Sequence, residues 1–197
     1  AFLQNISEIQ NIELLFFLFD DETYNLYLKE KNEILSYSER FSFTIHLPDK
    51  LNEDVIKLID ETSSFVKHYI VHSCKENKVF AENRLKQYLD KLIFENQGKI
   101  CHDELFRRKI IPDNCKICLD IGHILLYHSP EKAADMINKY HDKIEEFHIH
   151  GIKSGKDHKS LIHSKKEYTY LFDLINDVNT ITNIEIFSES DLNESLL

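Results

Sequence analysis

Short apolar runs alternate with longer amphipathic segments along the chain, the pattern typical of a parallel α/β fold. The run at residues 12–19 is apolar except for Glu13, as expected of a strand covered on both faces. In residues 54–67 apolar side chains recur at helical intervals, which favours an amphipathic helix. The pattern predicts strands at 12–19, 41–46, 69–72, 92–95, 117–120, 146–150 and 184–187. It predicts helices at 54–67, 81–91, 103–109, 130–140 and 168–178, a helix ending at 7–10, a short helix or loop at 33–39, and a polar loop at 151–166.

Residues that commonly bind metals stand at the ends of six of these predicted strands. The carboxyl ends of barrel strands open at one mouth, where barrel enzymes place their chemistry. The order of these residues therefore predicts a parallel barrel with its ligands facing one mouth. Histidine, aspartate and glutamate together suit zinc, manganese or iron. The strand-end residues are His46, His72, Glu95, Asp120 with His123, His148 with His150, and Glu185.

The sharpest local motif is Asp120-Ile-Gly-His123. An aspartate and a histidine three residues apart at a strand end can ligate neighbouring metals from one turn, and Gly122 would let the backbone bend tightly between them. The alternative is a buried aspartate beside an ordinary turn histidine. The other strand-end ligands favour the metal site.

Two glutamates have the setting of metal ligands. Glu95 follows a fully apolar strand that aims it at the mouth, where its carboxylate could bridge two metals. Glu185 lies between Ile184 and Ile186, the alternation expected of a half-inward strand. A buried glutamate that stays charged must be paired or bound to metal.

His148 and His150 share one strand face, so we expect one to ligate metal and the other, His150, to contact substrate. Asp157 and His158 follow in the polar loop as further candidate ligands, although a charged surface loop is the simpler alternative. Lys153 and Lys156 in the same loop would hold a phosphate, if they are not merely solvated. The remaining histidines are expected at the surface: His68, His102, His128, His141 and His163.

The length of the chain limits the number of domains and the size of the barrel. The 197 residues suffice for one sizeable core and show no repeat or linker, so we expect a single domain over residues 1–197. A complete (β/α)₈ barrel usually needs about 250 residues. No strand is predicted before residue 11, so we expect a TIM (β/α)₈-type barrel that is incomplete at its N-terminus and lacks its first strand.

The net charge of −10 argues against a nucleic-acid substrate, because phosphate backbones recruit basic surfaces. No apolar run approaches the roughly 18 residues of a membrane span. The four cysteines are expected to be free structural thiols, which fits a reducing cytoplasm. The chain has no glycine-rich phosphate loop and no G-x-S-x-G nucleophile motif.

The order of the strand-end ligands resembles the xylose isomerase-like, endonuclease IV-like TIM barrel superfamily. Cys118-Leu-Asp120-Ile-Gly-His123 is similar to its sixth-strand motif, and Glu185 to its last-strand glutamate. The stretch His148-Ile-His-Gly-Ile-Lys-Ser154, followed by Asp157-His158, is similar to its seventh strand and loop. His46, His72 and Glu95 fall where the third, fourth and fifth strands of the superfamily supply ligands.

Within that superfamily the sequence motifs are most similar to those of the cobamide-remodelling phosphodiesterases. Thr44-Ile-His46-Leu-Pro48, the stretch from His148 to Gly151, and the opening strand Ile12-Glu-Leu-Leu-Phe16 carry this resemblance. It implies a metal-dependent hydrolase that cleaves the phosphoribosyl linkage of the cobamide nucleotide loop. The expected partner is a small corrinoid substrate.

The expected mechanism is phosphodiester hydrolysis by two or three divalent ions, zinc in the first instance. Glu95 is expected to bridge metals, Glu185 to bridge or act as general base, and His150 to serve catalysis. Three alternatives stay open: an abasic-site DNA endonuclease, a sugar isomerase or epimerase, and a corrinoid-binding module without turnover. The endonuclease branch has Asn-Asp after the seventh-strand histidine and an Asp-x-His loop motif, both of which this chain lacks. The expected metal ligands are His46, His72, Glu95, Asp120, His123, His148, Asp157, His158 and Glu185.

Overall fold

A computed structural model describes residues 9–196, and its centre is a sheet of seven parallel strands. Each strand pairs with the next in the order β1-β2-β3-β4-β5-β6-β9. A separate antiparallel hairpin, β7 (Gly151–Lys153) and β8 (Lys156–Lys159), follows β6. The strands of the main sheet are β1 (Asn11–Leu15), β2 (Ser42–His46), β3 (Val66–His72), β4 (Leu92–Glu95), β5 (Lys116–Asp120), β6 (Ile144–Ile149) and β9 (Ile181–Ile184).

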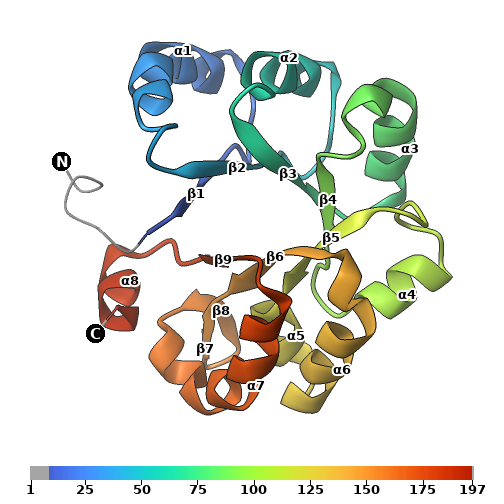
Figure 1. Cartoon of the computed structure of the whole chain (residues 1–197), viewed down its shortest axis with the longest axis vertical. Coiled ribbons are helices and arrows are strands. Elements are labelled where there is room, and N and C mark those ends of the chain that lie inside the picture. The colour runs from blue at the N-terminus through green and yellow to red at the C-terminus, as the bar shows by residue number, and fades with distance from the viewer. Residues whose placement is uncertain (1–8, 197) are drawn as a thin grey trace.

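Helices follow the strands and lie on the outside of the sheet (Figure 1). Neighbouring parallel strands need such crossover connections, because the chain must return to the starting edge of the sheet before the next strand can begin. The helices are α1 (Asp21–Ser36), α2 (Glu53–Thr62), α3 (Lys75–Arg84), α4 (His102–Arg107), α5 (Ile121–Tyr127), α6 (Pro130–Tyr140), α7 (Lys165–Val178) and α8 (Glu189–Ser195). Short 3₁₀ turns are η2 (Lys86–Tyr88), η3 (His141–Lys143) and η4 (Leu161–Ser164).

The sheet curves until β9 returns beside β1, so the strands form a nearly closed barrel (Figure 1). No backbone pairing joins β1 to β9 within residues 9–196, but Asn11 donates a side-chain hydrogen bond to Asn183 Oδ1 across the seam at 3.0 Å. The predicted α/β barrel class is therefore confirmed in its outline. The described part of the chain supplies seven strands to it, one fewer than a complete TIM barrel.

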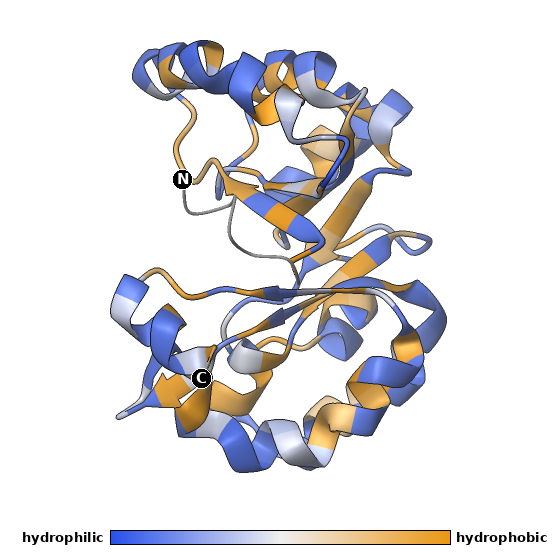
Figure 2. Cartoon of the chain, turned by 60° about the vertical axis from the view of Figure 1, so that its left-hand side comes forward, coloured by the Kyte–Doolittle hydropathy of each residue, from blue (hydrophilic) through white to orange (hydrophobic). Residues whose placement is uncertain are grey.

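Strand periodicity divides the buried side chains into two layers. Outward residues such as Tyr69 and Phe94 pack in the large core beneath the helices, whereas Ile70, Ile93 and Cys118 point inward and form a small cluster of their own. Figure 2 shows the apolar strands at the centre and the hydrophilic outer surfaces of the helices around them. The small apolar cluster fills only part of the barrel interior.

The strand register brings the predicted ligands to one edge. His72 pairs with Glu95 between β3 and β4, and Asp120 pairs with His148 between β5 and β6. His46, the last residue of β2, pairs with Leu15, the last of β1. All these strands are parallel, so their last residues share one mouth.

Several predicted boundaries are wrong. The strand predicted at 184–187 ends at Ile184, because Glu185 makes the last backbone bond of this ladder, from its N–H to Ile149 O at 3.0 Å. The polar loop at 151–166 contains the β7–β8 hairpin, whose turn has two residues with positive φ, Ser154 (55°) and Gly155 (73°). Helix α1 begins at Asp21, where the Asp20 side chain accepts the Thr23 N–H at 2.9 Å. The helix predicted to end at 7–10 lies outside the described residues apart from its last two positions, which are not helical.

Two histidines that were expected at the surface are buried. His102 is fully enclosed and donates from Nε2 to Phe94 O at 2.9 Å. His68 is 9% exposed and lies near Glu145. Within residues 9–196, none of the helices combines the length and apolar character needed to cross a bilayer.

Candidate metal centre

The two carboxylate oxygens of Glu95 face different groups of side chains. Oε2 lies 3.3 Å from His46 Nε2 and 3.2 Å from His72 Nε2. Oε1 lies 3.2 Å from His148 Nδ1. Glu95 is 1% exposed, so the carboxylate sits between these groups without contact with bulk water. One oxygen therefore belongs to a group that could hold a metal ion on the His46 side, and the other faces the His148 side.

On one side of Glu95, the mouth holds a group of two histidines. The ligand atoms of His46, His72 and Glu95 all lie within 4.8 Å of one another. They come from the ends of three adjacent strands, β2, β3 and β4. The rings of His46 and His72 meet edge to face, with their centroids 4.6 Å apart.

On the other side, a second group joins Glu95 to Asp120, His148 and Glu185, again with ligand atoms within 4.8 Å of one another. His148 Nδ1 lies 3.3 Å from Glu185 Oε2. Asp120 is fixed by the Asn96 amide, which donates to Asp120 O at 3.0 Å and accepts the Asp120 N–H at 2.9 Å. Three carboxylates and one imidazole suit a divalent ion such as zinc or manganese.

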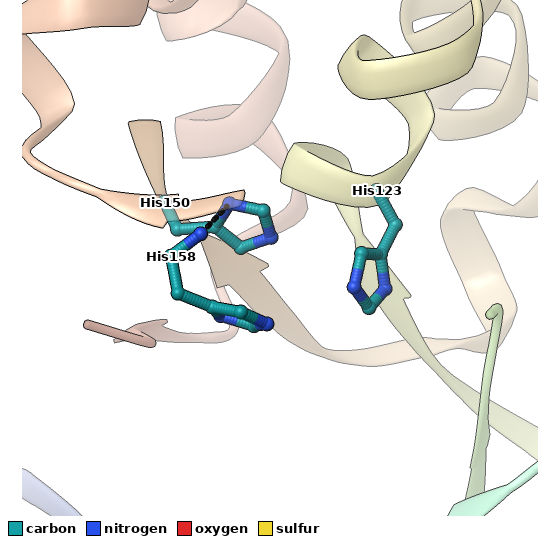
Figure 3. A group of neighbouring side chains, drawn as sticks. All are labelled: His123, His150 and His158. Atoms are coloured by element: carbon teal, nitrogen blue, oxygen red, sulfur yellow. Dashed lines mark hydrogen bonds between the residues drawn. The ribbon is translucent and has the colours of Figure 1, made fainter. Parts of the chain in front are cut away.

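A third group consists of His123, His150 and His158, drawn in Figure 3. His123 lies in the first turn of α5, and His158 belongs to β8 of the hairpin. The His158 N–H donates to His150 Nδ1 at 3.1 Å, the dashed line in Figure 3. His158 has a φ of 50°, and a left-handed conformation in a non-glycine residue persists only where neighbouring contacts fix it.

The nitrogens that face away from the shared centre have their own partners. His46 Nδ1 donates to Leu47 O at 3.0 Å, and His72 Nδ1 lies 2.8 Å from Asp49 Oδ1. His148 Nε2 lies 3.0 Å from Glu13 Oε2. Metal-binding histidines commonly hold their second nitrogen in this way, which fixes the ring and leaves the first nitrogen free to bind.

The pKa values of these groups describe a charge-balanced mouth. Burial would raise the pKa of Glu95, but hydrogen bonds with His148, His46 and His72 hold it well below its usual range. Burial likewise opposes ionisation of Asp120, yet the charge on His123 lowers its pKa. Against its own burial, the Asp120 carboxylate raises the pKa of His123 to about 10. Protons on histidines therefore balance the buried carboxylates, and divalent ions can replace those protons.

Several buried polar atoms at the mouth face a charged neighbour without a well-aligned hydrogen bond. Among the described residues, Asp120 Oδ2, His150 Nε2 and Glu185 Oε2 are of this kind. Asp120 Oδ2 lies 3.0 Å from His123 Nδ1, and Glu185 Oε2 lies 3.3 Å from His148 Nδ1. Ions bound between these groups would take the place of the histidine protons in such contacts.

The Asp120–His123 segment is not the tight turn that the sequence predicted. Ile121 begins helix α5, and the Asp120 side chain caps it by accepting the His123 N–H at 2.7 Å. Gly122 is part of this helix, and its lack of a side chain leaves room for the His150 ring. A Cβ at Gly122 would lie 2.3 Å from His150 Nε2, so only glycine lets this ring approach.

Among the nine predicted metal ligands, the structure brings eight together in these three groups: His46, His72, Glu95, Asp120, His123, His148, His158 and Glu185. His150, predicted to contact substrate, is fully buried and belongs to the third group. Asp157 is at the rim, with Oδ2 3.7 Å from His123 Nε2. Lys153 and Lys156 are exposed and pair with each other across the hairpin.

Three acidic residues of this region were not predicted from the sequence: Glu13, Asp49 and Glu146. Glu146 is two residues before His148 on the same strand face, a spacing that would have revealed it. Glu13 was noticed only as the one polar residue of an apolar strand. Asp49 follows Pro48 in a loop, and no pattern in the sequence singles it out.

No family model, curated protein or solved structure matches this chain.

Proposed function

We propose that this chain is a metal-dependent phosphodiesterase that hydrolyses the phosphoribosyl linkage of a cobamide nucleotide loop. The observation that carries the hydrolase part is the position of Glu95, whose two oxygens face separate ligand groups at 3.2–3.3 Å. A shared carboxylate between two such groups supports a centre of two or more divalent ions. Phosphodiester cleavage is a reaction for which such centres are well suited.

Bound divalent ions would lower the pKa of a water molecule and neutralise charge on the attacking and leaving oxygens. The chain's own residues hold and orient that centre. His46 and His72 approach Glu95 from one side, and His148 and Glu185 from the other. These contacts between buried or partly buried side chains fix the spacing of the two groups.

Glu185 is our candidate for proton transfer. Its Oε2 lies 3.3 Å from His148 Nδ1 and 3.8 Å from His158 Nδ1, yet makes no hydrogen bond among the described residues. As a general base it would take a proton from the attacking water. His150 belongs to the third group and is fully buried, so it would serve catalysis by holding that group in place.

The cobamide part of the proposal comes from the sequence resemblance. The phosphate would be held at the mouth, with Lys153 and Lys156 on the exposed β7–β8 hairpin able to reach toward a bulky substrate. A DNA substrate is disfavoured because the net charge is −10 and an extended phosphate backbone needs a basic surface.

The test is mass spectrometry of a cobamide incubated with zinc-reconstituted protein. We expect metal-dependent release of the lower-ligand nucleoside, and none with chelator-treated protein. The matched control is Glu95→Gln, which keeps the side-chain shape and removes the bridging charge. An intact cobamide with metal confirmed on the protein would contradict the substrate, and abasic DNA and ketose sugars would be assayed next.

A further inference from the structure

His148 lies between two acidic environments. Its Nδ1 faces the mouth, 3.2 Å from Glu95 Oε1. Its Nε2 faces the barrel interior, 3.0 Å from Glu13 Oε2 and 3.6 Å from Glu146 Oε1. The ring itself is fully buried. The groups on the mouth side belong to the candidate metal centre described above. On the interior side, ligand atoms of Glu13, Glu146 and His148 also lie within 4.8 Å of one another.

The interior acids form part of a polar layer beneath the mouth. Asn183 donates from Nδ2 to Glu13 Oε2 at 2.9 Å and also to Glu146 Oε1. Thr44 donates to Glu146 Oε1 at 3.4 Å, and Asn11 donates to Asn183 Oδ1 at 3.0 Å. These residues come from β1, β2, β6 and β9, so the layer also ties together the strands on both sides of the seam.

Glu13 has the better position to fix the ring. Its Oε2 is the nearer oxygen to His148 Nε2, and the Asn183 amide holds that oxygen from a second side. The Glu13 carboxylate oxygen can only accept a hydrogen bond, so Nε2 of His148 carries the proton of this contact. Nδ1 faces the Glu95 and Glu185 carboxylates in the same way, and a metal ion bound there would replace its proton. With Nε2 protonated, the lone pair of Nδ1 is then directed at the ion, as a metal ligand requires.

We propose that Glu13 is a positioning residue of the metal centre, which acts through His148 by holding the Nε2 proton and directing Nδ1 at the metal shared with Glu95, Asp120 and Glu185. The inference rests on the metal centre of the proposed function. The layer of Asn183, Asn11 and Thr44 keeps Glu13 and Glu146 in place. A carboxylate partner also makes the imidazole a stronger ligand than a neutral partner would.

The first experiment measures zinc retained per chain at stepwise lower free zinc, in wild type, Glu13→Gln and Glu145→Gln. Glu145 is the matched control, since it neighbours Glu146 on β6 but pairs with Lys116, away from the mouth. His148→Ala identifies the ion concerned. We expect Glu13→Gln to lose that ion at about 10- to 100-fold higher free zinc, while Glu145→Gln follows wild type.

The second experiment needs no substitution in Glu13, so it holds even if that variant fails to fold. Nitrogen-15 histidine spectra of the zinc-loaded protein report which ring nitrogen carries a proton, and His148→Gln assigns the signal by its loss. We expect the proton of His148 on Nε2. A proton on Nδ1, or zinc retention by Glu13→Gln equal to wild type, overturns the inference.

The outcomes separate this inference from the proposed function. If wild type and Glu13→Gln bind zinc equally and the cobamide is cleaved, only the role of Glu13 fails. If Glu13→Gln weakens zinc binding but no cobamide is cleaved, only the substrate fails. A wild-type protein that takes up no divalent metal contradicts both.

Discussion

The imidazole of His150 packs against Gly122 so closely that a Cβ built there would lie 2.3 Å from the ring. We therefore expect Gly122→Ala to displace His150 from the third group of ligands, at a stability cost of about 1–3 kcal/mol from overpacking. Zinc binding by His123, His150 and His158 should weaken with it. Urea unfolding and zinc titration measure the two effects.

The control for this prediction is the same substitution in a His150→Ala background. The clash is with the His150 ring, so its removal should make Gly122→Ala nearly neutral for stability. An equal cost in both backgrounds would show that helix α5, and not the ring, rejects the extra methyl group.

The buried His102 predicts acid sensitivity. Burial lowers its pKa from 6.5 to about 4, so the folded state holds the ring neutral while the unfolded state takes up a proton. The stability that this ring contributes is complete above pH 6.5 and is lost as the pH falls toward 4, by on the order of 3 kcal/mol. Urea unfolding across this range measures the loss. His102→Gln should show a shallower pH dependence, and an unchanged slope would contradict the assignment.

Zinc binding should release protons. At neutral pH the His123 ring is protonated, because the Asp120 carboxylate raises its pKa to about 10 against the effect of burial. The ring must lose that proton to bind metal, so zinc affinity should increase from pH 6 to pH 8. Calorimetry in two buffers of different ionisation enthalpy counts the protons released. A zinc affinity that does not change with pH would mean that the ligands are already deprotonated.

Lys153 and Lys156 provide a test of the substrate-binding role of the hairpin. Both are exposed and neither is in the metal groups, so alanine at either position should leave folding and metal content unchanged. If they hold the phosphate, the double variant should raise the KM for the phosphodiester several-fold with kcat nearly constant. The control is Lys165→Ala and Lys166→Ala in the following helix α7. Equal KM values for the two double variants would make the hairpin lysines ordinary solvated residues.

The strand-end ligands could be predicted because parallel strands place their last residues at one mouth. His46, His72 and Glu95 each end an apolar run, and the structure brings all three together. The structure places Glu185 beside Glu95, Asp120 and His148, although its strand was predicted to end at Phe187 and ends at Ile184. Its neighbours set the position, through the bond from Glu185 N–H to Ile149 O.

Features that depend on tertiary contact could not be predicted in the same way. Gly122 looked like a bend, but the reason for glycine is the ring of His150, which directly follows strand β6 and lies more than twenty residues later in the chain. Glu13 looked like an exception in an apolar strand, and its partner His148 lies 135 residues later in the chain. Neither contact can be predicted from the sequence pattern. Hydrophobic periodicity shows which face of a helix or strand is buried, but not which residue packs against that face.

The most direct test of the account is anomalous X-ray diffraction from crystals of the zinc-loaded protein, with data on both sides of the zinc edge. The account predicts one zinc peak among His46, His72 and Glu95 and a second among Glu95, Asp120, His148 and Glu185. Both peaks should touch the Glu95 carboxylate, one at each oxygen. Zinc elsewhere on the surface, with the mouth free of anomalous signal, would contradict the central claim that Glu95 bridges a multinuclear centre.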